Sequence, residues 1–184
     1  MAHDSHARHR SGLNDLGWRD RFSTQEADAR QYRYASAMGK RGVYTPQMIV
    51  NGSRDVLGSN RKEVLNAIRT AARPATILLA VSGTTLRAEL PEIAGGCDCD
   101  LLLVGILPST QTAVGRGENA GRLLSEFNVV RQVYALPSWD GSASTRSESV
   151  ETARQLPAVS LFALIAQRRA DARIVAVGVA RVIG

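Results

Sequence analysis

Lysine, aromatic residues and long apolar runs are all scarce in this chain. Lys40 and Lys62 are its only lysines, so arginine supplies nearly all of the 23 basic residues behind the formal charge of +6. Nucleic-acid-binding proteins concentrate basic residues and interleave them with aromatics, whereas here the arginines are scattered and aromatics make up only 5%. No apolar run approaches the roughly 20 residues of a membrane span. We therefore expect neither a nucleic-acid partner nor a membrane span.

Histidine is also scarce, which restricts the chemistry open to the chain. All three histidines, His3, His6 and His9, lie in the polar segment 1–12, which we expect to be a disordered tail. The serines elsewhere in the chain therefore lack the histidine base that a serine hydrolase needs. We expect no metal, no cofactor and no complete catalytic constellation, and we favour a protein that is not an enzyme.

Cysteine occurs only twice, at Cys97 and Cys99 in the stretch GGCDCD. The pair could chelate a soft metal, form a tight disulfide, or be two small residues at the start of a strand. We favour the last interpretation, because two ligands do not complete a structural zinc site, which needs about four.

The first half of the chain predicts two helices. Ser23 and Glu26 fit a capping box at the start of the first helix, which ends at Gly39. Asn60 and Glu63 fit the same role for the second helix, which ends before Pro74. Four residues are expected on the apolar face of that second helix: Val64, Leu65, Ile68 and Ala72.

A hairpin is predicted between these helices. Met48–Val50 reads as a short buried strand, Asn51-Gly52 as a tight turn, and Asp55–Leu57 as the return strand. Thr45-Pro46 stands immediately before the first strand, where the missing N–H of proline is tolerated.

After Pro74 the chain becomes rich in β-forming segments separated by turn signals. Seven such segments predict an antiparallel, sandwich-like β-domain. One of them, 161–166, also fits a short helix, although it lacks helical length and caps. The predicted fold class is α/β plus all-β, with the tail at 1–12, an α/β part at 13–74 and a β-rich domain at 75–184.

The loop GRGENAGR, residues 115–122, combines glycines with polar side chains. Arg116 and Arg122 could clamp an anion that the glycines admit to backbone N–H groups, and Glu118 with Asn119 could bind a metal. The loop lacks the Gly-Lys-Ser/Thr ending of a phosphate-binding loop. We favour a structural loop over either binding role.

The order helix, Thr-Pro, strand, Asn-Gly turn, strand and helix resembles the C-terminal half of a thioredoxin fold. The resemblance implies that Pro46 is a cis-proline and that Thr45 faces the substrate, with Tyr44 beside it. Such an edge can pair with an extended peptide as an added strand. The resemblance therefore implies a peptide-binding site at Tyr44, Thr45 and Pro46.

Several stretches are similar to the bacterial domain-of-unknown-function 1223 family over residues 14–184: GWRDRF, ARQYRYASAMG, VYTPQMIVNG, VLGS, VGRGENAGRLL, NVV and WDG. This resemblance implies a secreted or periplasmic protein with a thioredoxin-like domain, a β-rich C-terminal domain and no established reaction. The family pattern begins with a signal peptide and a strand-helix-strand carrying Cys-x-x-Cys, and neither is visible here. The chain is thus expected to be an N-terminally truncated member, cytoplasmic as written.

The missing Cys-x-x-Cys decides the functional hypotheses. Disulfide exchange requires a reactive thiolate, so we predict no dithiol oxidoreductase activity in this form and favour binding of a peptide or protein in the cell envelope. One alternative is an oxidoreductase-like protein whose cysteine motif was lost to a wrong start or a frameshift, and another is an anion-binding module through GRGENAGR. The first strand of the hairpin would lack a neighbour, so we also expect self-association through its exposed edge.

Overall fold

A computed structural model describes residues 25–114, 121–151 and 158–182 of the chain. One helix precedes the first β-hairpin and a second follows it, and all the later regular elements are strands. The elements are α1 (Gln25–Ala37), β1 (Gln47–Val50), β2 (Arg54–Leu57), α2 (Arg61–Thr70), β3 (Ala75–Thr76), β4 (Leu78–Ser82), β5 (Thr85–Leu90), β6 (Cys99–Ala113), β7 (Leu123–Trp139), β8 (Ser144–Ser149), β9 (Leu161–Arg168) and β10 (Ile174–Arg181).

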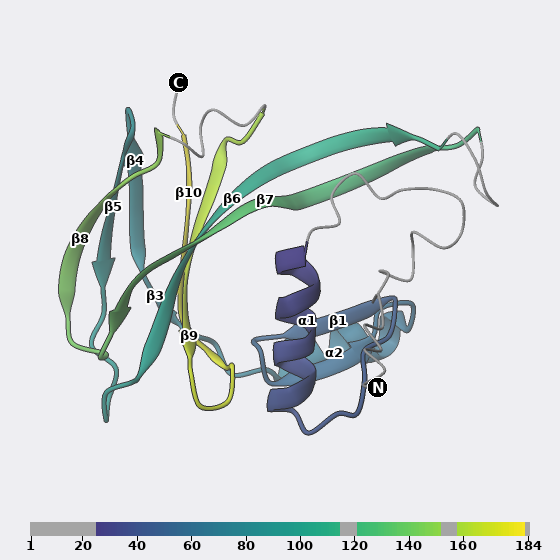
Figure 1. Ribbon diagram of the computed structural model, residues 1–184, viewed down its shortest axis with the longest axis horizontal. Coiled ribbons are helices and arrows are strands. Elements are labelled where there is room, and N and C mark those ends of the chain that lie inside the picture. Colours follow the sequence, from purple (N-terminus) through teal and green to yellow (C-terminus); the bar gives the residue numbers. More distant parts are fainter. Residues whose placement is uncertain (1–24, 115–120, 152–157, 183–184) are drawn as a thin grey trace, which may run out of the picture.

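The strands that follow α2 form two sheets packed against each other (Figure 1). One sheet has five strands in the order β3-β10-β9-β6-β7, and the other has three in the order β4-β5-β8. The strand pairs are antiparallel except for β3 with β10, which run parallel. The predicted combination of an α/β part with a β-rich part is confirmed at this level, and the ambiguous run 161–166 falls in strand β9.

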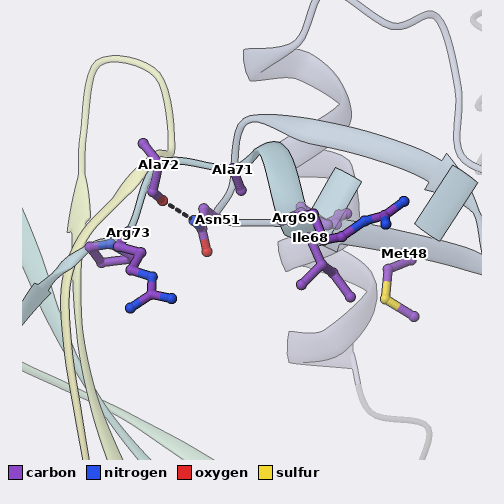
Figure 2. A pocket seen from close by; sticks show the side chains of 10 residues that line it. Met48, Asn51, Ile68, Arg69, Ala71, Ala72 and Arg73 are labelled. Carbon is purple, nitrogen blue, oxygen red and sulfur yellow. Dashed lines mark hydrogen bonds between the residues drawn. The ribbon is translucent and has the colours of Figure 1, made fainter. Parts of the chain in front are cut away.

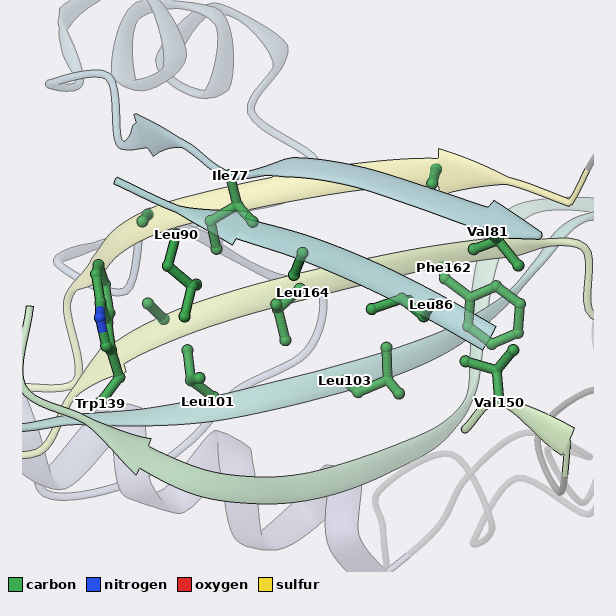
Figure 3. Packing of buried hydrophobic residues seen from close by; sticks show 14 of the residues in the cluster. Ile77, Val81, Leu86, Leu90, Leu101, Leu103, Trp139, Val150, Phe162 and Leu164 are labelled. Atoms are coloured by element: carbon green, nitrogen blue, oxygen red, sulfur yellow. The ribbon is translucent and has the colours of Figure 1, made fainter. Parts of the chain in front are cut away.

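A continuous hydrophobic core lies between the two sheets (Figure 3). Strand β5 shows why, because its residues alternate between exposed and buried along TLRAEL, as expected for a sheet with one buried face. Leu86 from this strand and Phe162 from β9 are both fully buried. Trp139 lies at one end of the core, where its indole N–H donates to the Ser142 carbonyl at 2.7 Å.

Cys97 and Cys99 are joined by a disulfide at the start of β6. Cys99 is fully buried as the first residue of that strand. The favoured sequence interpretation was therefore incomplete, because the pair marks the start of a strand and is also covalently linked. Both cysteines belong to the sandwich core or its edge, so their position is explained by packing.

Strands β6 and β7 are not the short strands that were predicted. They form one hairpin with strands of 15 and 17 residues, which arches away from the sheet over α1 (Figure 1). Pairing with β9 stops at Ile106, whereas pairing with β7 continues to Ala113. In a sequence, a run of polar residues usually indicates that a strand has ended. Here Thr110 and Gln111 still pair with residues of β7, because a two-stranded ribbon accepts polar residues on its solvated face.

The segment before residue 74 forms a smaller unit of α1, α2 and the β1–β2 hairpin. Asn51 and Gly52 occupy the turn with φ of 48° and 69°, the left-handed values that an Asn-Gly turn requires. Asn60 caps α2 as predicted, since its Oδ1 accepts from Glu63 N–H at 3.2 Å and its Nδ2 donates to Glu63 Oε2 at 3.2 Å. The core here consists of Val50, Val56 and Ala67.

The predicted apolar face of α2 is only partly buried. Val64 packs against the small core, but Leu65 and Ile68 are 42% and 53% exposed. Ala67, which the prediction left out, is fully buried instead. The physical reason is that, among the described elements, α2 packs mainly on the two-stranded β1–β2 hairpin, which covers one narrow stripe of the helix.

The α/β unit contacts the sandwich through polar groups. Arg30 of α1 donates to Gln167 Oε1 at 3.3 Å, and Arg33 forms an ion pair with Asp100 at 3.0 Å. The Asn51 carbonyl accepts from the Ile174 N–H at 3.0 Å. Whether the two units fold as separate domains divided near residue 74 stays a prediction, and none of the described helices is long and apolar enough to cross a membrane.

Candidate functional site

The Thr45-Pro46 segment lies exposed at the start of β1, and its peptide bond is cis. Helix α1 supports the segment through Gln31, whose Nε2 donates to the Tyr44 carbonyl at 3.1 Å and to Gln47 Oε1 at 2.9 Å. The three predicted site residues Tyr44, Thr45 and Pro46 are thus presented together, next to a strand, on the surface.

Tyr44 and Asp55 form a hydrogen-bonded pair beside this segment. The Tyr44 hydroxyl donates to Asp55 Oδ2 at 2.9 Å, and Lys40 pairs with Asp55 Oδ1 at 3.3 Å. Partial burial raises the pKa of Tyr44, and the bond to Asp55 raises it further. Burial alone would raise the pKa of Asp55, but the hydrogen bonds from Tyr44 and Lys40 outweigh it and lower that pKa. Both groups therefore keep their ordinary protonation states near neutral pH, with the Tyr44 hydroxyl as the donor and the Asp55 carboxylate as the acceptor.

Strand β1 has a strand neighbour on one edge only among the described residues. The Pro46 carbonyl accepts from the Gly58 N–H at 2.8 Å, in register with the β1–β2 pairs. Along an antiparallel strand, the backbone N–H and C=O groups of successive residues point alternately to one edge and the other. The backbone groups of Met48 therefore point toward β2, as the Pro46 carbonyl does. The N–H and C=O groups of Gln47 and Ile49 therefore point to the other edge, where no described strand pairs with them.

An open groove of about 630 Å³ runs beside this edge of β1 (Figure 2). Its apolar lining includes Met48 and Val50 from β1 and Ile68 from α2, and Met48 and Ile68 are 38% and 53% exposed. Asn51 bridges β1 to the end of α2, because its Nδ2 donates to the Ala72 carbonyl at 2.6 Å. This hydrogen bond holds the end of β1 and the end of α2 together at one end of the groove.

Two arginines, Arg69 and Arg73, also line the groove. Both are exposed, and neither forms an ion pair with a described acidic side chain. Arg33 and Arg169, in contrast, both pair with Asp100. The groove thus combines apolar lining, positive charge and a strand edge that pairs with no strand in the described part of the chain.

Of the residues predicted to bind an anion, Arg122 is the one that the structure describes. Arg122 is exposed beside the first residue of β7, and its carbonyl accepts from the Val114 N–H at 2.9 Å. Arg116, Glu118 and Asn119 lie outside the described residues. Within the described ranges, no group of three or more His, Cys, Asp or Glu residues is arranged to hold a metal.

Sequence reasoning missed Ile68, Arg69 and Arg73 as site residues. One signal was available for Ile68: it was placed on the apolar face of a helix whose predicted partner was a two-stranded hairpin. Such a hairpin has too little surface to cover the whole face, so part of it had to stay exposed. Arg69 and Arg73 carried no signal, because scattered arginines occur throughout the chain.

Comparison with known proteins identifies relatives of this chain. A solved structure of similar fold is the X-ray crystal structure of protein AGR_C_4864 from Agrobacterium tumefaciens, with a TM-score of 0.71 and 21% sequence identity, covering 89% of this chain and 73% of that chain. No curated protein gives a significant match. A family model described as a protein of unknown function, DUF1223, matches residues 11–167. The chain therefore belongs to the DUF1223 family.

Proposed function

We propose that this protein is a binding module that takes up an extended peptide segment along the free edge of β1. One observation carries the proposal: the edge formed by Gln47 and Ile49 has no described strand neighbour and opens onto an apolar groove. Unpaired strand edges bind extended peptides through main-chain hydrogen bonds, and adjacent pockets select side chains.

The dimensions of the edge define the bound segment. Strand β1 has four residues, which corresponds to a length of about 13 Å. A peptide of similar length can pair with Gln47 and Ile49 while placing alternate side chains toward Met48 and Ile68. Thr45 and Pro46 extend the surface at the open end, which connects the groove to the site expected from sequence.

The order of elements supports a thioredoxin-like relationship for this unit. Helix α1, Thr45-Pro46, β1, β2 and α2 follow one another as in the C-terminal half of that fold. Peptide recognition beside the proline is the property that this relationship implies, and it requires no cysteine. We propose the cell envelope as the place of action because the resemblance to the DUF1223 family implies a secreted or periplasmic protein.

The test removes the hydrogen-bonding edge without removing the fold. Ile49→Pro deletes an N–H that points away from β2, whereas Ile49→Ala shortens the side chain and keeps the N–H. The probe is a panel of fluorescent ten-residue peptides with alternating apolar and polar residues, in acidic, neutral and basic versions. We expect wild type and Ile49→Ala to bind at least one version and Ile49→Pro to bind none, as measured by fluorescence polarisation.

Hydrogen exchange provides a second measurement in case Ile49→Pro disturbs the fold. Peptide binding should slow exchange at the Gln47 and Ile49 amides of the wild-type protein more than at the Met48 amide, which already faces β2. Failure of every peptide to bind would overturn the proposal. Equal binding by Ile49→Pro would do so as well, and so would a dimer in sedimentation that Ile49→Pro dissociates, because a second copy of the chain would then occupy the edge.

A further inference from the structure

We infer that the segment bound at this edge is acidic and that Arg69 and Arg73 recognise its carboxylate groups. The inference rests on the proposed function and adds the chemical class of the ligand. Both residues line the groove that borders β1, the same groove that would receive a segment paired with Gln47 and Ile49.

The local charge balance favours an acidic partner. Neither Arg69 nor Arg73 is paired with a described acidic side chain, and both are exposed. Some other arginines of the protein do have acidic partners, as Arg168 and Arg173 share Asp171. Guanidinium groups form short, bidentate hydrogen bonds with carboxylates, which adds geometric selectivity to charge attraction.

The same balance disfavours a second copy of the chain as the occupant. The protein carries a formal charge of +6, so two copies repel each other at long range. An acidic peptide is attracted by the same charge, and the attraction raises its rate of association in a salt-dependent manner.

The apolar part of the groove limits which acidic segments fit. Met48 and Ile68 offer exposed apolar surface next to the two arginines, so a uniformly charged peptide would leave that surface uncovered. Side chains alternate across an extended strand. The preferred ligand is therefore an extended segment in which apolar residues alternate with aspartate or glutamate.

The experiment compares acidic, neutral and basic peptides that share one apolar pattern. With wild-type protein, we expect the acidic version to bind at least tenfold more tightly than the neutral version, and the basic version to bind least. The double variant Arg69→Glu/Arg73→Glu should lose at least tenfold in affinity for the acidic peptide. Raising the salt from 50 to 500 mM should weaken acidic binding in wild type because the contact is electrostatic.

The double variant Arg61→Glu/Lys62→Glu is the matched control. It makes the same charge change in the first turn of α2, at the opposite end of the helix from Arg69, and neither residue lines the groove. We expect this control to bind the acidic peptide within about threefold of wild type, since only long-range attraction is reduced.

The outcomes separate this inference from the proposed function. Equal binding of the three peptides, abolished by Ile49→Pro, would overturn the acidic selectivity and leave edge binding intact. The same conclusion follows if Arg61→Glu/Lys62→Glu weakens binding as much as Arg69→Glu/Arg73→Glu, because the effect would then be one of net charge. Absence of binding by every peptide would overturn both.

Discussion

The sandwich and the α/β unit differ most in how completely they bury apolar side chains. The sandwich core spans two sheets and includes fully buried Phe162, Leu86 and Leu101, whereas the small core described in the α/β unit consists of Val50, Val56 and Ala67. Two facing sheets cover each other, but a two-stranded hairpin cannot cover a helix of ten residues. The sandwich therefore provides stability, and the apolar surface left exposed in the α/β unit provides the candidate site.

Truncation of the sandwich core should cause the largest loss of stability. Phe162→Ala removes a fully buried ring that packs between the sheets, so we expect the free energy of unfolding to fall by about 3–5 kcal/mol. Urea denaturation measures the loss. Phe127→Ala is the control, because Phe127 is 72% exposed and its truncation should change stability by less than about 0.5 kcal/mol. Similar losses in both variants would contradict the assignment of the core.

The junction between the two units should be the next most sensitive position. A side chain at Gly52 would collide with the Ala172 carbonyl, and its φ of 69° disfavours any other residue. We expect Gly52→Ala to cost about 2–3 kcal/mol, measured by urea denaturation, because overpacking adds to backbone strain. Gly83→Ala is the control, since Gly83 has a φ of 55° and open space around it, and should cost about 1 kcal/mol. Equal losses would show that the contact with Ala172 is absent in solution.

Loss of the α2 cap should have a smaller effect, confined to the α/β unit. Asn60→Ala removes the acceptor for the Glu63 N–H, so we expect a loss of about 1 kcal/mol and faster hydrogen exchange in the first turn of α2. Asn66→Ala, in the exposed middle of the same helix, should be neutral or slightly stabilising, because alanine is the better helix former. Faster exchange throughout the sandwich in Asn60→Ala would contradict the independence of the two cores.

The ion pairs of Asp100, one with Arg33 of the α/β unit and one with Arg169 of the sandwich, should contribute least. Arg169 and Arg33 outweigh the effect of burial and hold the pKa of Asp100 below its usual value. This contribution to stability is therefore present above the unfolded pKa near 4 and is lost as the pH falls through the lower folded pKa. We expect Asp100→Asn to lower the melting temperature by roughly 1–3 °C at pH 7 and by nothing measurable near pH 2.

Glu92→Gln is the control for the acid titration. Glu92 is exposed and forms no ion pair with a described residue. The Glu92→Gln variant should therefore have the same melting temperature as wild type at both pH values. A difference between Asp100→Asn and wild type that persisted at pH 2 would show that the side chain acts through packing.

Local sequence signals predicted most elements of the fold but not their extent. The Asn51-Gly52 turn and the Asn60 cap formed as predicted, because each depends on residues within three or four positions. The long β6–β7 hairpin was missed, because the length of a strand depends on whether a partner stays in register, and that partner is distant in sequence. The link between Cys97 and Cys99 remained one option among three for a similar reason, since their spacing permits a disulfide without requiring it.

In the candidate site, too, some features follow from local sequence and others depend on distant parts of the chain. The sequence was enough to place Thr45-Pro46 before a short strand, to put a helix on each side of the hairpin, and to identify the DUF1223 family. The folded structure was needed to show that one edge of β1 has no strand neighbour among the described residues and that Ile68, Arg69 and Arg73 line the groove beside it. The physical reason is that local propensities form helices and turns, whereas exposure depends on how much partner surface the folded chain brings to each element.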